Sequence, residues 1–284
     1  MNNIKFKIVT DSSSDVTYTD GVEFSAVPLK IRTNEKEFSD TPDLDVGDML
    51  SHLEGYKGKS YSSCPNSNEW YTAFGDAENI FCVSITRNLS GSYNAGKTAA
   101  EEYIKNHPER KVYVFDTLSV GPECAILMER IKKGILDGES FETIVEKANS
   151  LLSRTHLFFA LESLRNLANN GRANPLVAKM AGALGIRVIG KASDEGTLEV
   201  TDKVRGVLKT IDCLFANMKK AGYLGGRVRI HHCENENSAA LLKDKILSLF
   251  PLAEVSLHPT RALCSFYAER GGLLVGFEDG KSLC

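Results

Sequence analysis

The sequence predicts an α/β fold with at least one partly parallel sheet. Short apolar runs of strand length alternate with amphipathic segments of about ten to fifteen residues. Turn residues separate these segments, and a chain of 284 residues with 42% hydrophobic and 25% charged residues is typical of a globular protein. We therefore expect two α/β domains of ordinary size, residues 1–155 and 156–284, with an approximate boundary across which segments could exchange.

The first half contains four apolar runs that we expect to form strands. They are Phe6–Thr10, Phe24–Ile31, Asn79–Ile85 and Lys111–Thr117. Segments with helical character lie between or after them: one beginning at Ser67, one beginning near Ser90, and the segments Pro122–Leu136 and Phe141–Leu152.

The second half repeats the alternation. Strands are expected at His156–Glu162, Ile186–Ala192, Thr197–Val204, Arg227–Cys233, Ala253–Pro259 and Gly272–Glu278. Helices are expected at Val207–Ala221 and Ser238–Leu249. The residues Asp194–Gly196 are typical of a tight turn, so the strands on either side of them should form a hairpin.

Composition and charge exclude several classes of function. A formal net charge of −3 does not favour nucleic acid as a partner. The chain has neither a signal peptide nor an apolar stretch of about 18 residues, so we expect a cytoplasmic protein without stable membrane insertion. Seven irregularly spaced cysteines predict neither a disulfide framework nor a zinc site. His231 and His232 are neighbours on a strand and face opposite sides, so we expect no metal site there.

Three loops at strand ends are rich in small polar side chains. They are Thr10–Asp15, Ser60–Asn66 and Asn88–Ala95. Ligands of open α/β sheets bind beyond the carboxyl ends of the strands, so these loops could converge on one crevice. The same residues are also favoured as helix caps and in turns, and this second interpretation stays open.

The segment Asn88–Ala95, of sequence NLSGSYNA, predicts an anion site because it joins a strand to a helix. Amides at a helix N-terminus and the helix dipole favour negative charge. One interpretation is a carboxylate pocket formed by Ser90 and Gly91. The alternative is a phosphate loop over Gly91–Thr98, since the spacing of Gly91, Gly96 and Lys97 matches the nucleotide-binding pattern. A helix that begins near Ser90 would place Lys97 about two turns in and away from the anion, which favours the carboxylate pocket.

Several motifs in order along the chain resemble the DegV family. They are Thr10-Asp11-Ser12 followed by Asp15, Val27-Pro28-Leu29 with Asp40, SSCPN (Ser62–Asn66), LSGSYNA (Leu89–Ala95), Asp116-Thr117, Asn170-Gly171-Arg172, Lys203-Val204-Arg205 and His258. The matches run from residue 8 to about residue 258. The resemblance implies two α/β domains with the ligand site at their junction, as in the fatty-acid-binding subunits of bacterial fatty acid kinase.

The resemblance also implies a function and roles for individual residues. The protein would be a carrier in phospholipid metabolism rather than an enzyme, without a cofactor, that buries a long-chain fatty acid and presents its carboxylate to a partner kinase. Ser90 and the Gly91 amide would hold the carboxylate together with Ser62 or Ser63. The remaining implied roles are extra positive potential from Arg172 and His258 and kinase docking by Arg205.

The chain departs from the family pattern around this implied site. Thr86-Arg87 stands where the family usually has two serines, and Asn66 takes a hydroxyl position. Asn170 replaces a glycine, and His258 precedes Pro259 instead of a glycine-rich turn. The rim of the anion site is therefore expected to differ from that of other members.

Overall fold

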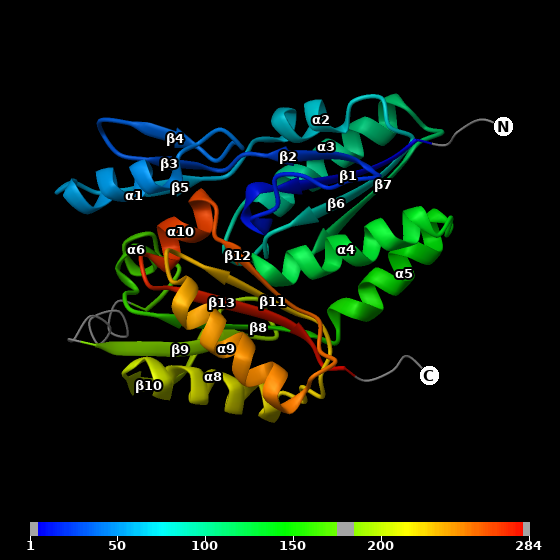
Figure 1. Ribbon diagram of the computed structural model, residues 1–284. Helices are drawn as coiled ribbons and strands as arrows, with labels where there is room; N and C mark the ends of the chain where they lie inside the picture. The colour runs from blue at the N-terminus through cyan, green and yellow to red at the C-terminus, as the bar shows by residue number, and fades with distance from the viewer. Residues whose placement is uncertain (1–4, 175–184, 281–284) are drawn as a thin grey trace.

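The chain folds into two α/β halves that lie one above the other in Figure 1. The structure is a computed structural model, and it describes residues 5–174 and 185–280. The N-terminal half, coloured blue to green, holds one parallel sheet and one small antiparallel sheet, and the C-terminal half holds a larger mixed sheet. The predicted α/β class is thus confirmed.

The first sheet is parallel, with the strand order β2-β1-β6-β7. Its strands are β1 (Phe6–Asp11), β2 (Glu23–Val27), β6 (Asn79–Ser84) and β7 (Lys111–Asp116). The helices α2 (Ser67–Phe74) and α3 (Ser92–Asn106) cover one face, and α4 (Pro122–Leu136) and α5 (Phe141–Leu152) cover the other. All six residues of β6 are buried, as expected for a central strand covered on both faces.

The second sheet has the order β10-β9-β8-β13-β11-β12, and its strands pair antiparallel except for β11 with β12. The strands are β8 (Thr155–Leu161), β9 (Ile186–Ala192), β10 (Leu198–Arg205), β11 (Val228–His232), β12 (Val255–Pro259) and β13 (Leu273–Glu278). The helices α8 (Val207–Lys220) and α9 (Glu236–Leu249) pack on one face. The predicted hairpin around Asp194–Gly196 joins β9 to β10, and Gly196 adopts the left-handed backbone that the turn requires, with φ +74°.

A small antiparallel sheet of order β4-β3-β5 covers the other face of the second sheet. It consists of β3 (Lys30–Arg32), β4 (Glu37–Ser39) and β5 (Tyr61–Ser63), with α1 (Val46–Gly55) beside it. Ile31, Phe38 and Met49 from this N-terminal segment share one apolar cluster with Phe159 and Val188 of the C-terminal sheet. The junction of the two halves is therefore an apolar core, and the domain boundary near residue 155 stays a prediction.

The single strand predicted at Phe24–Ile31 is wrong, because β2 ends at Val27 and β3 begins at Lys30 in a different sheet. Pro28 has no amide hydrogen to donate to a neighbouring strand, which favours the end of the strand at this point. The Leu29 amide bonds the Ser12 hydroxyl at 3.0 Å instead of a neighbouring strand. The chain can therefore leave the first sheet here and cross to the C-terminal half.

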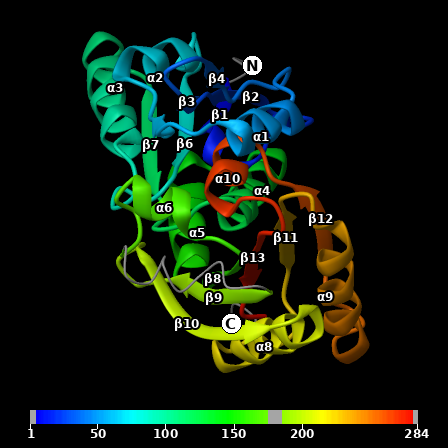
Figure 2. The ribbon, with the colours of Figure 1, turned by 90° about the vertical axis from the view of Figure 1, so that its left-hand side faces the viewer.

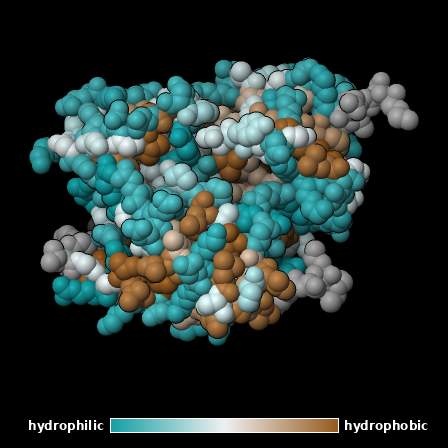
Figure 3. Space-filling view, viewed as in Figure 1, coloured by the Kyte–Doolittle hydropathy of each residue, from teal (hydrophilic) through white to brown (hydrophobic). Residues whose placement is uncertain are grey.

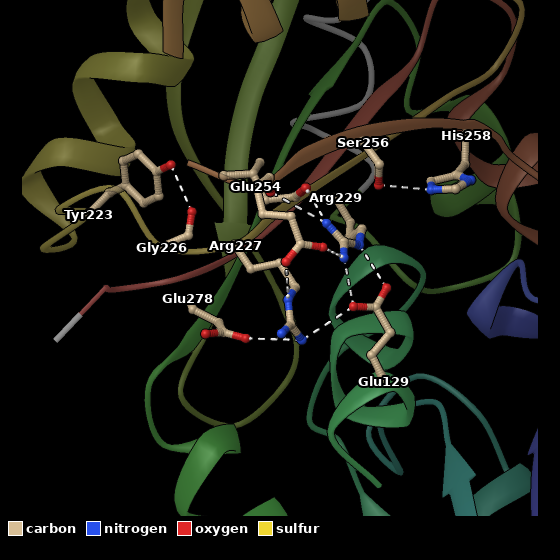
Figure 4. A network of polar contacts seen from close by, with 10 residues as sticks. Glu129, Tyr223, Gly226, Arg227, Arg229, Glu254, Ser256, His258 and Glu278 are labelled. Carbon is tan, nitrogen blue, oxygen red and sulfur yellow. Dashed lines mark hydrogen bonds and ion pairs between the residues drawn. The ribbon is translucent and has the colours of Figure 1, made fainter. Parts of the chain in front are cut away.

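Charged side chains also join the two halves (Figure 4). Glu129 of α4 accepts two hydrogen bonds of 2.7 Å from Arg229 of β11, which also pairs with Glu254. Arg227 adds ion pairs to Glu129 at 3.2 Å and to Glu278 at 3.4 Å. Because α4 packs against strands of both large sheets, this cluster reinforces a contact that is already apolar.

Apolar residues gather on the C-terminal half, in the lower part of the face shown in Figure 3. In the same half, Leu241 and Leu249 of α9 are exposed, as is Leu252, which follows that helix. Within residues 5–174 and 185–280, no helix combines the length and the apolar character that a bilayer span requires.

Candidate functional site

The buried Asp11 carboxylate fixes the loop that precedes α3. It lies at the end of β1 and has no exposed surface. Its Oδ2 accepts hydrogen bonds from the Ser84 hydroxyl at 2.9 Å, the Ile85 amide at 3.1 Å and the Ser92 hydroxyl at 2.6 Å. Ser13 donates to Oδ1 through its amide and its hydroxyl. Burial raises the pKa of the Asp11 carboxyl group, and these hydrogen-bond donors oppose the shift. The hydrogen bond from Ser92 holds the start of α3 at the carboxyl edge of the first sheet.

The helix α3 begins at Ser92, with Gly91 as the residue that precedes its first turn. The predicted helix start near Ser90 is therefore confirmed. The first amides of a helix lack acceptors within the helix, so those without a local partner can bind an anion. The Ser92 amide already donates to the Ser90 hydroxyl at 3.3 Å. Gly91 also has little room, since a Cβ atom there would lie 3.2 Å from the Cys64 sulfur. A glycine at this position lets the loop that carries Ser62, Ser63 and Cys64 come close to the helix N-terminus.

A cavity of about 260 Å³ opens beside this helix N-terminus, between the two halves. Most of its wall is apolar. Leu157, Phe159 and Leu161 alternate along β8 and therefore present one face of that strand to it. The other apolar lining residues are Leu29, Ile85, Leu89, Val120, Leu167, Leu198, Leu263, Ala268 and Leu274. Such a wall suits an extended hydrocarbon group.

The polar lining comes from several separate segments of the chain. Ser62 and Ser63 come from β5, and Ser90 and Gly91 from the loop before α3. Arg172 follows α6 (Arg165–Asn169), and its Nε donates to the Leu89 carbonyl oxygen at 3.2 Å. Hydroxyl, amide and guanidinium donors thus line one cavity, which gives a carboxylate both hydrogen bonds and positive charge.

Tyr267 is a polar lining residue that the sequence did not single out. It lies on α10 (Ala262–Ala268), which packs against α1 and β3 and is drawn in orange-red near the centre of Figure 2. Its hydroxyl is 2.7 Å from the Ser62 hydroxyl, and burial raises its pKa. Cys64 and Cys264 also line the cavity. No local pattern indicates Tyr267 or Cys264, because α10 is far in the sequence from the other segments that line the cavity.

The structure brings five of the predicted ligand residues together and separates two other predicted residues from them. Ser62, Ser63, Ser90, Gly91 and Arg172 all line the apolar cavity.

His258 lines a different, charged cavity beside His231 and Arg229, because β12 is the edge strand at the far end of the second sheet. Its ring nitrogen Nε2 is 2.9 Å from the Ser256 hydroxyl, and burial lowers its pKa, helped by His231 and Arg229. His258 is therefore not among the residues that line the cavity beside Ser90. Arg205, the predicted kinase-docking residue, is exposed at the end of β10 and does not line the cavity.

The geometry of Gly91–Thr98 gives no support to the alternative phosphate loop. The residues between Gly91 and Gly96 are helical, and the Ala95 amide donates to the Gly91 carbonyl oxygen at 3.0 Å. These residues therefore cannot wrap around a phosphate chain. Lys97 is exposed on α3 and is absent from the lining of the cavity. In the part of the chain that the structure describes, no group of three or more His, Cys, Asp or Glu side chains is arranged to hold a metal ion.

Comparison with known proteins gives the same family along nearly the whole chain. Residues 5–278 match the model of the "Uncharacterised protein, DegV family". A DegV domain-containing protein of Streptococcus pneumoniae is 39% identical over 277 residues, covering 96% of this chain and 99% of the relative.

Two solved structures are similar in both sequence and fold. One is a DegV family protein from Eubacterium eligens loaded with heptadecanoic acid, with a TM-score of 0.94, 43% identity, and coverage of 96% of this chain and 99% of the other. The other is the Fatty Acid Kinase (Fak) B3 protein of Streptococcus pneumoniae loaded with linoleic acid, with a TM-score of 0.95, 39% identity and the same coverage. On the family match and these identities, the chain belongs to the DegV family.

Proposed function

We propose that this protein binds a long-chain fatty acid as a carrier and has no catalytic role of its own. The observation that carries the proposal is the apolar cavity between the two halves, which is lined in part by the hydroxyl and amide donors of Ser62, Ser90 and Gly91. Two proteins that are 39–43% identical to this chain hold fatty acids in their crystal structures. The acyl chain would occupy the apolar part of the cavity along β8.

The donors at the polar part of the cavity explain how a carboxylate can be buried there. A carboxylate that leaves water must regain its hydrogen bonds, or its burial costs several kcal/mol. The Ser90 hydroxyl and the Gly91 amide form one side of the proposed clamp, and Ser62 with Ser63 forms the other. Arg172 supplies a positive charge from the C-terminal half. The ligand would then touch both halves and stabilise their contact.

We further propose that the bound carboxylate is presented to a partner kinase, which would phosphorylate it for phospholipid synthesis. The support is the similarity to the Fak B3 protein. Exposed cations on a docking face would pair with acidic residues on such a partner. Arg205 is exposed at the end of β10 and is the proposed docking residue. The cysteines that the structure describes are free thiols, which is typical of the reducing cytoplasm, where ATP is available.

The test is to identify and then exchange the bound lipid. Protein purified from cells is analysed by native mass spectrometry, extracted with organic solvent, stripped of lipid and titrated with linoleic acid. We expect a co-purified acyl chain and saturable binding of one linoleic acid per chain. A stripped protein that is folded but does not bind linoleic acid would contradict the proposal.

The docking proposal has a separate test with an isolated fatty acid kinase and ATP. Arg205→Ala should leave linoleic acid binding unchanged and slow the formation of acyl phosphate. Lys105→Ala, which removes an exposed cation on α3, is the control and should support the wild-type rate. If wild-type protein loaded with linoleic acid gives no acyl phosphate, the partner role fails and the binding role remains.

A further inference from the structure

We propose that Phe159 of β8 and Gly190 of β9 together form the wall that closes the apolar cavity on its β9 side, and that this wall limits the size of the acyl chain that the protein accepts. This inference rests on the proposed fatty acid binding and deepens it by naming the residues that select among acyl chains. It starts from Gly190, which is buried and is the only glycine in the strands β8, β9 and β10, all of which the structure describes.

Gly190 leaves a gap in one face of the second sheet. It is the direct partner of Phe159 in the antiparallel pair of β8 and β9, so the two positions lie on the same face. On its other side Gly190 is the partner of Val200 on β10. Val188 and Val200 pack in the same apolar cluster as Phe159, so this face points toward the N-terminal half. Because glycine has no side chain, the face has an open position between Phe159 and Val200.

The Phe159 ring fills this open position. A Cβ atom on Gly190 would overlap Cζ of Phe159 and would lie 2.6 Å from Cε2. These atoms belong to the far end of the ring, so the ring leans toward β9 and covers the Gly190 backbone. Aromatic rings that cover a glycine on a neighbouring strand stabilise a sheet. The same Cβ atom would lie 2.5 Å from the Glu199 carbonyl oxygen, so even an alanine does not fit at this position without a shift.

The lining of the cavity changes at this ring. On the other side of Phe159, Leu161 lines the cavity, and so does Leu274, which is the partner of Phe159 on β13. Val188 and Val200 share the sheet face on the β9 side, but they are not among the described residues that line the cavity. The ring therefore separates the cavity from the space over β9 and β10. A longer acyl chain can enter that space only if the ring becomes smaller or moves.

The size of residue 159 should consequently select among acyl chains. Protein interiors are close-packed, so a chain that is too long for the cavity must displace a wall or leave part of itself outside. Phe159→Leu shortens the side chain and uncovers Gly190, where no other side chain fills the gap. Additional methylene groups of a longer ligand can then be buried, and their burial stabilises the complex.

The experiment compares two fatty acids on stripped protein. Linoleic acid is one probe, and docosadienoic acid, which has as many double bonds and a longer chain, is the other. In Phe159→Leu the ratio of the two dissociation constants should shift by about 10-fold in favour of the longer acid, the value expected from one or two additional buried methylene groups. Phe158→Leu is the matched control, because Phe158 is buried on the opposite face of β8 and does not line this cavity. It should keep the wild-type ratio.

A second pair of variants tests the role of Gly190. Gly190→Ala should push the ring into the cavity and weaken linoleic acid binding relative to that of the shorter myristic acid. Gly190→Ala combined with Phe159→Leu should restore the wild-type ratio for these two acids, because leucine does not reach the added Cβ atom. Circular dichroism and urea unfolding show whether each variant is folded. If Gly190→Ala does not fold, the comparison of Phe159→Leu with Phe158→Leu decides the inference.

Three results would overturn the inference. They are an unchanged ratio in folded Phe159→Leu, an equal shift in Phe158→Leu, and a double variant that keeps the preference of Gly190→Ala, since the alanine would then act through Glu199 and not through the ring. A failure of the wild-type protein to bind linoleic acid would instead contradict the proposed function itself.

Discussion

Ser90 lies at the point where the loop after β6 meets the cavity and the start of α3. Its hydroxyl accepts from the Ser92 amide at 3.3 Å and lines the cavity, so its hydrogen is available to a ligand. If one partner of a buried hydrogen bond is removed, the other group is left unsatisfied, and the free-energy cost exceeds the net contribution of one hydrogen bond.

Ser90→Ala should therefore weaken linoleic acid binding by about 1–3 kcal/mol, the cost of a buried polar group that loses its partner. The measurement is a displacement titration of stripped protein. Ser150→Ala, an exposed serine on α5, is the control and should bind as the wild type does. Wild-type affinity in Ser90→Ala would remove Ser90 from the proposed carboxylate clamp.

Glu123 is a buried acid that the proposed function does not use. Its carboxyl group contacts the Ser119 hydroxyl and the Thr155 hydroxyl, both at 2.5 Å, and so links α4 to β8. Burial raises its pKa to about 7, although these hydrogen bonds oppose the shift. The folded protein therefore keeps this proton at pH values where the unfolded chain has already lost it.

The sign of the pH effect follows from that difference. The raised pKa stabilises the folded state fully below pH 4.5, and this contribution is lost as the pH rises to about 7. Glu123→Gln cannot ionise, so its free energy of unfolding should fall less than that of the wild type between about pH 5 and pH 7, by up to about 3 kcal/mol. Urea unfolding at a series of pH values measures this. Parallel pH profiles for the two proteins would show that Glu123 ionises normally in the fold.

The β9–β10 hairpin is the element that connects the C-terminal sheet to the anion loop. Its tip contacts the N-terminal half, where the Asn88 side-chain amide donates to the Glu195 carbonyl oxygen at 2.5 Å. A Cβ atom on Gly196 would clash with the Thr86 hydroxyl oxygen and would lie 2.7 Å from the Leu118 carbonyl oxygen. The hairpin can approach this closely only because residue 196 has no side chain.

Gly196→Ala should accordingly destabilise the protein and weaken ligand binding, since the hairpin tip must move away from the loop that carries Ser90. Gly138→Ala is the matched control, because Gly138 has a similar φ of +73° but a Cβ atom there would meet no atom of the described residues within 4 Å. Both changes carry the cost of a left-handed alanine, about 1–2 kcal/mol, and only Gly196→Ala adds a clash. Equal losses in urea unfolding for the two variants would contradict a tight contact at the tip.

The two halves are joined by the apolar core and by the charged cluster around Arg229. The Arg229 side chain is only 7% exposed and pairs with Glu129, whose side chain is 38% exposed. A buried guanidinium that loses a partner is destabilising, while exposed ion pairs contribute little. The contribution of Glu129 to the free energy of unfolding should lie between those of a buried and an exposed ion pair, because Glu254 remains as a second partner of Arg229.

Glu129→Ala should lower the free energy of unfolding by about 1–3 kcal/mol, an estimate between the values for exposed and buried ion pairs. The control is Glu142→Ala, which breaks an exposed pair with Lys111 and should cause a much smaller loss. Urea unfolding of both variants gives the comparison. If the two variants lose the same stability, the charged cluster does not hold the halves together.

Local patterns in the sequence were enough for the α/β class, the start of α3 and the β9–β10 hairpin. Strand and helix periodicity, helix-start residues and the turn at Asp194–Gly196 are properties of short segments, so they can be recognised without knowing the fold. The motif order along the chain also indicated Ser62, Ser90 and Arg172, which the structure brings into one cavity.

The tertiary structure decided which distant segments meet. The crossing of β3, β4 and β5 onto the second sheet, the apolar wall from β8 and the approach of Tyr267 to Ser62 depend on contacts between residues far apart in the chain. The position of His258 also depends on the tertiary structure, because His258 lies on the edge strand β12 and lines a different cavity from Ser90. The physical reason is that backbone propensity acts over a few residues, whereas the composition of a cavity depends on how complete sheets and helices pack.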